Sequence, residues 1–256
     1  MIIATWNVNS IRARAQRVMA WLQLRRPDVL CMQEIKIEEV EFPSLELKAL
    51  GYDVMVEGQR TYNGVAIASR LPMREVRRGL GDGEADAQAR LLWVSVEGVR
   101  IASVYAPNGQ TVGSDKWRYK LRWLERLRRH LEQTGDPQQP LALCGDWNVA
   151  PEARDVHDPV RWEKAVLFHP DARAALARVC AWGLRDAYRL HHEEAGRYTW
   201  WDYRQLAFPK NLGLRIDHIL VTAPLASRCQ AVEIDREARK GKQPSDHAPV
   251  VATFEP

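Results

Sequence analysis

Residues 141–151 constrain the fold of this chain more than any other stretch. They read Leu-Ala-Leu-Cys-Gly-Asp-Trp-Asn-Val-Ala-Pro, a short apolar run that ends in a carboxylate and an amide. Pro140 and Pro151 enclose the run and leave little room for a helix, so we predict a buried strand. Asp146 and Asn148 then project to one side, because side chains alternate along a strand. Two interpretations are open: a site for a hard cation or a water, or an Asx-turn in which both side chains only satisfy the backbone.

Other apolar runs also end in polar side chains. The predicted strands 2–6, 28–32 and 100–105 lead to Asn7, Glu34 and Tyr105. A predicted strand over residues 215–221 contains Asp217, and Asp246 and His247 precede the last strand, residues 250–254. Sites tend to be built at one rim of a rigid sheet scaffold. We therefore treat these polar residues as one candidate constellation.

Helical patterns separate several of the strands. Apolar residues recur at helical spacing from Ile11 to Leu22, after a Ser10 that is suited to cap a helix. Further helices are predicted over residues 44–50, 117–131 and 172–182. Many strands with helices spaced among them are typical of two packed sheets with helices outside. We find no linker or shift in composition, and therefore predict one domain spanning residues 1–256.

The predicted helix 117–131 carries basic side chains around its apolar stripe, and we interpret them as a solvated helix face. They are Lys116, Arg118, Lys120, Arg122, Arg126, Arg128 and Arg129. We also interpret His130, His191 and His192 as surface residues.

Composition excludes several classes of protein. No apolar segment is long enough to span a bilayer, and the N-terminus lacks the features of a signal peptide, so we expect a cytoplasmic protein that does not bind membranes. A net charge of +4 is only compatible with a polyanionic partner. No CxxC pair occurs, which indicates reduced core cysteines rather than a zinc site or a disulfide framework. These residues are Cys31, Cys144, Cys180 and Cys229.

The chemistry of the strand ends favours a hard cation. Carboxylates such as Glu34 and Asp146 are suited to Mg²⁺, with Mn²⁺ as the natural substitute. The sequence contains no P-loop pattern, no GxSxG, no HExxH and no GxGxxG. A site for a hard cation at the strand ends is therefore the candidate that remains.

Six segments, in order along essentially the whole chain, resemble the motifs of the exonuclease III family of AP endonucleases, within the endonuclease/exonuclease/phosphatase superfamily. They are WNVNSIRAR, PDVLCMQEIK, YAPNGQ, GDWNVAP, RIDHIL and SDHAPV. One such motif is weak, but six in order are very specific. The resemblance implies an α/β, four-layer αββα sandwich of two mixed β-sheets flanked by helices, and metal-assisted hydrolysis of a phosphodiester.

The resemblance also implies a role for each residue of the constellation. Asp146 positions and deprotonates the attacking water, and Asn148 hydrogen-bonds that water or a phosphate oxygen. His247 contacts the phosphate and is oriented by Asp217, while Tyr105 bonds the phosphate or assists the leaving group. Glu34 is the principal metal ligand, and Asp246 completes the metal shell or supports it. The full implied metal set is Asn7, Glu34, Asp146, Asn148, Asp246 and His247.

The substrate depends on other segments. Residues 198–203 resemble the aromatic stretch that walls a pocket for a flipped-out, baseless sugar, with Trp200, Leu214 and Ile216 as its apolar walls. The alternative is that the tryptophans only pack a sheet. Arg12 is a candidate for a phosphate contact, together with three further basic residues. These are Arg70, Lys210 and Arg215.

Two departures from the family pattern leave details open. Asn9 stands where some members have Asp, so one or two metal ions are possible. Leu214 stands where some have Trp, and a more open pocket would admit ordinary 3′-terminal nucleotides. We expect a monomeric DNA repair enzyme of compact bacterial form, associated with the nucleoid. It would cleave double-stranded DNA 5′ to abasic sites and trim blocked 3′ ends as a 3′→5′ exonuclease. The alternatives are a small-molecule or lipid-headgroup phosphatase and a catalytically silent DNA-binding module.

Overall fold

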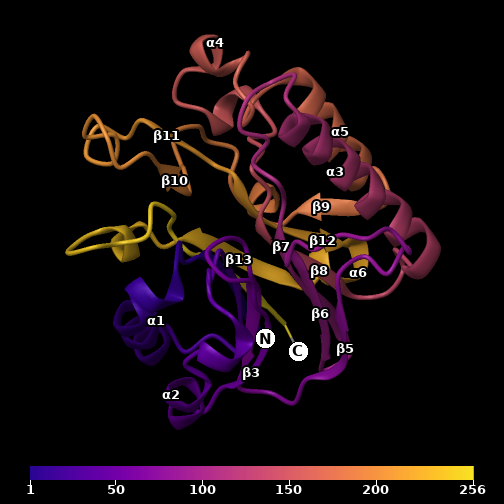
Figure 1. Ribbon diagram of the computed structural model, residues 1–256, viewed down its shortest axis with the longest axis vertical. Coiled ribbons are helices and arrows are strands. Elements are labelled where there is room, and N and C mark those ends of the chain that lie inside the picture. Colours follow the sequence, from indigo (N-terminus) through magenta and orange to yellow (C-terminus); the bar gives the residue numbers. More distant parts are fainter. Residues whose placement is uncertain (256) are drawn as a thin grey trace.

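Two six-stranded sheets lie face to face in the computed structural model, which describes residues 1–255 (Figure 1). The first sheet contains β1 (Ile2–Asn7), β2 (Val29–Gln33), β3 (Asp53–Glu57), β4 (Val65–Ser69), β13 (Cys229–Ile234) and β14 (Val250–Phe254). The second contains β5 (Arg74–Arg78), β6 (Leu91–Val96), β7 (Val99–Tyr105), β8 (Leu141–Asp146), β9 (Leu184–Asp186) and β12 (Asp217–Thr222). Their strand orders are β13-β14-β1-β2-β4-β3 and β5-β6-β7-β8-β12-β9.

Helices cover the outer face of each sheet. In Figure 1, α1 (Ile11–Arg25) and α2 (Ser44–Ala49) lie beside the first sheet, and α3 (Asp115–Thr134) and α5 (Pro170–Cys180) lie beside the second. The predicted four-layer αββα sandwich is therefore confirmed. The shorter elements are α4 (Pro159–Trp162), α6 (Ala223–Ala226), the ribbon of β10 (Trp200–Trp201) and β11 (Gly213–Leu214), and four 3₁₀ turns. The turns are η1 (Glu39–Glu41), η2 (Ala153–Asp155), η3 (Tyr188–Leu190) and η4 (Arg236–Arg239).

Both faces of each central strand are buried, because side chains alternate between two cores. Ile3 and Cys31 face the second sheet and meet residues such as Ile101 and Cys144. Their neighbours Ala4 and Leu30 face outward and pack under α1. The side chains of α3 and α5 cover the second sheet in the same way. Cys31 and Cys144 are buried, as predicted for core cysteines, whereas Cys180 and Cys229 are only partly buried.

Each sheet contains one parallel pair of strands, and these two pairs position the site. In the first sheet β1 runs parallel to β2, which places Asn7 opposite Gln33. In the second, β7 runs parallel to β8, which places Tyr105 opposite Asp146. Parallel strands end at the same edge of a sheet, so each pair delivers two polar residues to one rim. Both helix α1 and helix α3 follow a capping serine, since the side chains of Ser10 and Ser114 accept from Ala13 N and Trp117 N.

The sequence pattern also predicts strands over residues 52–56, 65–69 and 90–96, which correspond to β3, β4 and β6. In the two six-stranded sheets, the strands that it does not predict are β5, β9 and β13, each the last strand on one side of its sheet. The sequence of β5 is Arg-Glu-Val-Arg-Arg, and its side chains are mostly exposed. Charged residues are common on edge strands, where they discourage pairing with another chain. Hydrophobic periodicity is therefore too weak there to reveal a strand.

The prediction of a wholly solvated basic face on α3 is wrong at two positions. Lys120 is fully buried, and Arg126 is only 6% exposed. Arg126 lies against the acidic loop that precedes β6 and pairs with Asp82 and Asp86. His130 is also buried rather than on the surface, and its ring lies against Trp93. Among residues 1–255, no helix has the length and apolar character needed to cross a membrane.

Candidate active site

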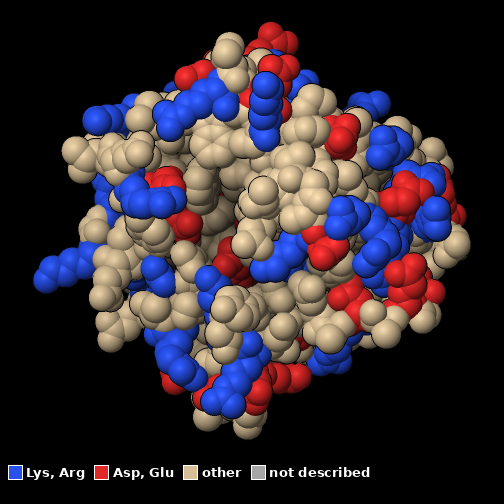
Figure 2. Space-filling model, turned by 45° about the horizontal axis from the view of Figure 1, so that its top comes forward, with Lys and Arg blue, Asp and Glu red and all other residues tan. Residues whose placement is uncertain are grey.

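The two sheets bring three potential metal ligands together at the rim where their parallel pairs end. Glu34 follows β2, Asp146 ends β8, and His247 precedes β14. One ligand atom from each residue lies within 4.8 Å of the others. Turned to bring the top of Figure 1 forward, the molecule shows a hollow with acidic atoms inside it and Lys and Arg side chains around it (Figure 2).

Asp146 takes part in both arrangements that the sequence left open. Its Oδ1 accepts from the backbone N–H of Asn148 at 2.9 Å, which is an Asx-turn. Its Oδ2 faces the site and accepts from the Asn7 side chain at 2.9 Å. One carboxylate oxygen therefore satisfies the turn while the other remains directed at the reaction centre.

Gly145 is required by the sheet rather than by a ligand. A Cβ at this position would lie 1.8 Å from the carbonyl oxygen of Val104, in the neighbouring strand β7. No real side chain tolerates that distance from backbone. The glycine thus lets β7 and β8 approach each other, and so sets the separation between Tyr105 and Asp146 that the parallel register produces.

His247 and Asp217 form a buried pair beside Asp146. The Nδ1 of His247 lies 2.8 Å from Asp217 Oδ2, and its Nε2 lies 3.8 Å from Asp146 Oδ2. Burial alone would lower the pKa of His247, but the carboxylates of Asp217 and Asp146 outweigh it and raise this pKa to about 10. The imidazole is therefore held as a cation that points at the site.

Burial and neighbouring carboxylates act together on Asp146. The desolvation of its carboxyl group, with Asp217 and Glu34 close by, raises its pKa to about 7, although His247 opposes the shift. Such a concentration of buried negative charge is costly without a cation. The carboxylates of Glu34 and Asp146 fit a divalent ion such as Mg²⁺ or Mn²⁺, whereas the cationic imidazole of His247 is suited to a phosphate.

Asn7 joins the two sheets across the site. Its amide nitrogen donates to Glu34 Oε1 at 2.8 Å and to Asp146 Oδ2 at 2.9 Å, while its oxygen accepts from the backbone N–H of Asn9. Lys36 lies on the far side of Glu34, with its Nζ 2.7 Å from Glu34 Oε2. In this arrangement Asn7 sets the distance between the two carboxylates.

Asp246 lies beside the three-residue group and not within it. Its Oδ1 accepts from Asn9 Nδ2 at 2.9 Å, and its Oδ2 accepts from the indole N–H of Trp200 at 3.0 Å. Both carboxylate oxygens are thus occupied by neighbouring side chains. This geometry corresponds to the supporting position, one of the two that the sequence left open for Asp246.

Asn148 and Tyr105 complete the rim. The amide nitrogen of Asn148 donates to Ala106 O, and its oxygen accepts from Asn108 at 3.0 Å. Tyr105 is 9% exposed, and burial, together with Glu34 and Asp146, raises the pKa of its hydroxyl well above the usual range. The hydroxyl therefore keeps its proton.

Three residues in the loops of the site have a left-handed backbone. Asn9, Glu34 and Asn148 all have φ between 44° and 52°, the left-handed region that few residues other than glycine adopt. Such conformations cost roughly 1–3 kcal/mol each and persist where surrounding contacts fix them. The tertiary contacts of the rim therefore hold these three residues in place.

The predicted pocket walls are more enclosed than expected. Leu214 and Ile216 are 0% and 1% exposed, because residues 150–168 fold over them and bring Leu167 and Phe168 into contact. Trp200 is half-buried and meets Trp162 edge-on, with ring centroids 6.2 Å apart. The expectation of an open pocket at Leu214 is therefore wrong for this structure.

The basic candidates differ in their surroundings. The side chain of Arg12 is 70% exposed and pairs with Glu41. Lys210 is also exposed, in the loop between β10 and β11. Arg215 is 1% exposed and bonds Asp155 and Asp186, so it belongs to a buried ion network and is not free to meet a phosphate. Arg70 follows β4, which runs antiparallel to β2, and so lies at the end of the sheet away from Glu34.

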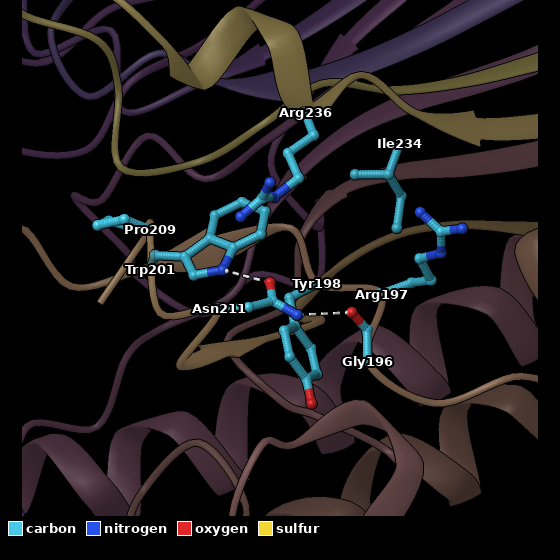
Figure 3. A pocket seen from close by; sticks show the side chains of 8 residues that line it. All are labelled: Gly196, Arg197, Tyr198, Trp201, Pro209, Asn211, Ile234 and Arg236. Atoms are coloured by element: carbon cyan, nitrogen blue, oxygen red, sulfur yellow. Dashed lines mark hydrogen bonds between the residues drawn. The ribbon is translucent and has the colours of Figure 1, made fainter. Parts of the chain in front are cut away.

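A separate cavity of about 320 Å³ lies on the Trp201 side of the β10–β11 ribbon (Figure 3). The indole N–H of Trp201 donates to Asn211, which in turn donates to Gly196 O. Arg197 and Arg236 also line it. Successive strand residues point to opposite faces, so this cavity is separated from Trp200 and contains none of the predicted site residues.

Sequence reasoning did not assign a role to three polar residues that support the rim. Asn108 holds Asn148, Lys36 holds Glu34, and Lys120 binds the loops from inside the protein. Asn108 lies within the YAPNGQ segment, so its motif was a usable signal. Lys36 likewise ends the PDVLCMQEIK segment. Lys120 carries no such signal, because lysine is usually a surface residue.

Comparison with known proteins agrees with this geometry. The model of the endonuclease/exonuclease/phosphatase family matches residues 4–247. The chain belongs to this family. Exodeoxyribonuclease III of Haemophilus influenzae is 34% identical over 99% of this chain and 100% of its own length. The predicted exonuclease III membership is thereby confirmed.

Solved structures of family members also superpose closely. An AP endonuclease from Archaeoglobus fulgidus matches with a TM-score of 0.97 and 43% identity over the full length of both chains. The 3′-5′ exonuclease NExo from Neisseria meningitidis matches with a TM-score of 0.95 and 40% identity, also over both full lengths. An AP endonuclease and a 3′-5′ exonuclease therefore share their whole fold with this chain.

Proposed function

We propose that this protein is a metal-dependent DNA repair phosphodiesterase that cleaves 5′ to abasic sites and trims 3′ ends on duplex DNA. The observation that carries the proposal is the group of Glu34, Asp146 and His247 at the rim where two sheets meet, in which Glu34 is partly exposed and the other two are buried. The names of full-length relatives, an exodeoxyribonuclease III and an AP endonuclease, support both activities. A Neisseria 3′ phosphatase bound to a product DNA hairpin supports action on 3′ ends.

The residues of the site supply the proton transfers and the charge stabilisation. Asp146 accepts the proton of a water molecule that attacks phosphorus, and its burial beside the Asp217 and Glu34 carboxylates favours the protonated form. As the bond from phosphorus to the 3′ oxygen breaks, cationic His247 stabilises the charge on the phosphate oxygens. Asn148 orients the water or a phosphate oxygen, and the Tyr105 hydroxyl assists the departing oxygen. The products are a 3′-hydroxyl and a 5′-phosphate.

Glu34 and Asp146 are the residues that would hold the metal ion, with Asn7, Asn148 and Asp246 around them, whereas cationic His247 would meet the phosphate. When bound, Mg²⁺ or Mn²⁺ neutralises phosphate charge and stabilises the departing 3′ oxygen. We propose Mg²⁺ as the working ion, since carboxylate-rich sites that bind phosphate substrates are typical of it.

The proposed substrate is double-stranded DNA with abasic sites or blocked 3′ ends, bound by a monomer. Trp200 would contact the baseless sugar, and Leu214 and Ile216 would be reached once residues 150–168 move aside. Arg12 would meet a backbone phosphate, because it is exposed in the first turn of α1, directly after the Asn9 loop. Action on cellular DNA implies a cytoplasmic, nucleoid-associated enzyme.

The test is a gel assay of matched duplexes, one with an abasic site and one undamaged, each with Mg²⁺ and with chelator. We expect a nick 5′ to the abasic site that requires Mg²⁺, and slower shortening from 3′ ends. An intact abasic duplex, under conditions where a known enzyme cuts it, would overturn the proposal. Release of inorganic phosphate from inositol phosphates without DNA nicking would favour a small-molecule phosphatase instead.

A further inference from the structure

Lys120 occupies an unusual place for a lysine. It lies on α3, and its exposed fraction is 0%. No carboxylate lies within ion-pair distance of its ammonium group among residues 1–255, although buried lysines normally have such a partner. Its Nζ donates instead to three backbone carbonyl oxygens, those of Asn108 at 3.1 Å, Asn148 at 2.7 Å and Val166 at 2.7 Å. Burial of the ammonium group is costly and lowers the pKa of Lys120 to about 7, and the three charge-assisted hydrogen bonds offset part of that cost.

Two of the three carbonyls belong to a pair of residues that already contact each other. The side chain of Asn108 donates to Asn148 Oδ1 at 3.0 Å. Lys120 binds the backbone carbonyl groups of both asparagines, and their side chains bind each other. Asn108, Asn148 and Lys120 are therefore joined in a closed network of three hydrogen bonds. The third carbonyl, Val166 O, belongs to residues 150–168, which cover Leu214 and Ile216.

The backbone of Asn148 needs such a restraint. Its φ is 52°, in the left-handed region. Its backbone N–H group donates to Asp146 Oδ1 in the Asx-turn, and its backbone carbonyl oxygen accepts from Lys120. The carbonyl that Lys120 binds is therefore the second fixed point of this strained residue. A shift there would move the Asn148 amide away from Asp146 Oδ2, from which its nitrogen lies 3.3 Å.

We propose that Lys120 is a positioning residue for the proposed reaction. Its buried ammonium group fixes Asn148 against Asp146 by binding the Asn108 and Asn148 carbonyls, and it joins the covering segment 150–168 to the same point. The inference rests on the proposed function, because Asn148 acts on the substrate there. Lys120 itself does not touch the substrate.

The test uses Lys120→Met, which keeps the length of the side chain and removes its charge. Arg126→Met is the matched control, because Arg126 is a buried cation on the same helix that binds the Asp82 and Asp86 loop. Both variants should lose stability. Single-turnover cleavage of an abasic duplex, at saturating substrate and below both melting temperatures, should fall about 10- to 100-fold for Lys120→Met and less than about 3-fold for Arg126→Met, because precise placement of a catalytic group affects rate strongly.

A double-mutant cycle separates positioning from general structural damage. If Lys120 acts through Asn148, Lys120→Met should reduce the single-turnover rate only slightly in an Asn148→Ala background, because the side chain that Lys120 positions is absent there. In a Tyr105→Phe background, Lys120→Met should reduce the rate by the same factor as it does in the wild-type protein. Equal costs in both backgrounds, or an unaltered rate in Lys120→Met, would overturn the inference. An inactive wild-type protein would instead count against the proposed function.

Discussion

Glu34 and Asp146 occupy matching places in the two halves of the molecule, yet their surroundings differ. Each lies at the end of a parallel strand pair, β1 with β2 and β7 with β8. The Glu34 side chain is 18% exposed and has the Lys36 ammonium group 2.7 Å away. Asp146 is 1% exposed and faces the His247 imidazole. A carboxylate open to solvent and paired with a displaceable cation is suited to exchange ions. A buried carboxylate with a raised pKa is suited to accept a proton.

The comparison predicts that Asp146→Asn has the largest effect on catalysis. The amide cannot accept a proton from water, so the single-turnover rate on an abasic duplex should fall about 10³-fold or more. The melting temperature in chelator should stay level or rise, because a buried carboxyl group with a raised pKa is itself unfavourable. A variant that kept near-full rate would show that Asp146 is not the base.

Glu34→Gln should have the second largest effect on the cleavage rate. The loss of one anionic oxygen ligand should reduce the rate about 10²-fold at ordinary Mg²⁺ and raise the half-saturating Mg²⁺ concentration about 10-fold or more. Isothermal titration with Mn²⁺ measures the affinity directly, with Lys48→Gln as an exposed, uninvolved control. Unchanged metal affinity would remove Glu34 from the metal site.

Asp217→Asn tests the His247–Asp217 pair through the pH dependence of the free energy of unfolding. The pKa of His247 is about 10 in the folded protein against an ordinary value of 6.5. The folded protein therefore binds this proton more tightly, and the stability it contributes is present below pH 6.5 and is lost as the pH rises towards 10. In chelator, wild-type stability should fall over this range, and Asp217→Asn should remove most of the fall. An identical pH dependence in the two proteins would contradict the pairing.

The smallest effect is expected at Lys36. Lys36→Met removes a positive charge from Glu34, so Mg²⁺ should bind a few-fold more tightly and the rate at saturating Mg²⁺ should change by less than about 5-fold, as partly exposed ion pairs contribute little. A loss as large as that of Glu34→Gln would mean that Lys36 contacts the substrate.

The sequence could predict the parts of this molecule that local pattern determines. Apolar runs that end in Asn7, Glu34 and Asp146 predicted both the strands and the rim, and six ordered motifs predicted the αββα sandwich. The Asx-turn at Asp146 was one of two stated alternatives, and the structure contains it together with the site-facing oxygen.

The remainder depends on contacts between distant segments. The burial of Lys120 arises from three loops that meet at one point, and no pattern along α3 announces it. Leu214 and Ile216 are closed over by residues 150–168, whose mixed and charged sequence has no apolar pattern that indicates this contact. Gly145 is needed because β7 approaches its Cα, a fact that strand pairing alone determines.

A metal titration of Glu34→Gln and Asp146→Asn, side by side, tests the contrast between the two carboxylates most directly. The single-turnover rate of abasic-duplex cleavage would be measured from micromolar to tens of millimolar Mg²⁺. The rate of Glu34→Gln should climb towards the wild-type rate as Mg²⁺ increases, because its defect is occupancy. The rate of Asp146→Asn should stay low at every concentration, because its defect is proton transfer. Recovery of Asp146→Asn by Mg²⁺, with Glu34→Gln unresponsive, would contradict the account.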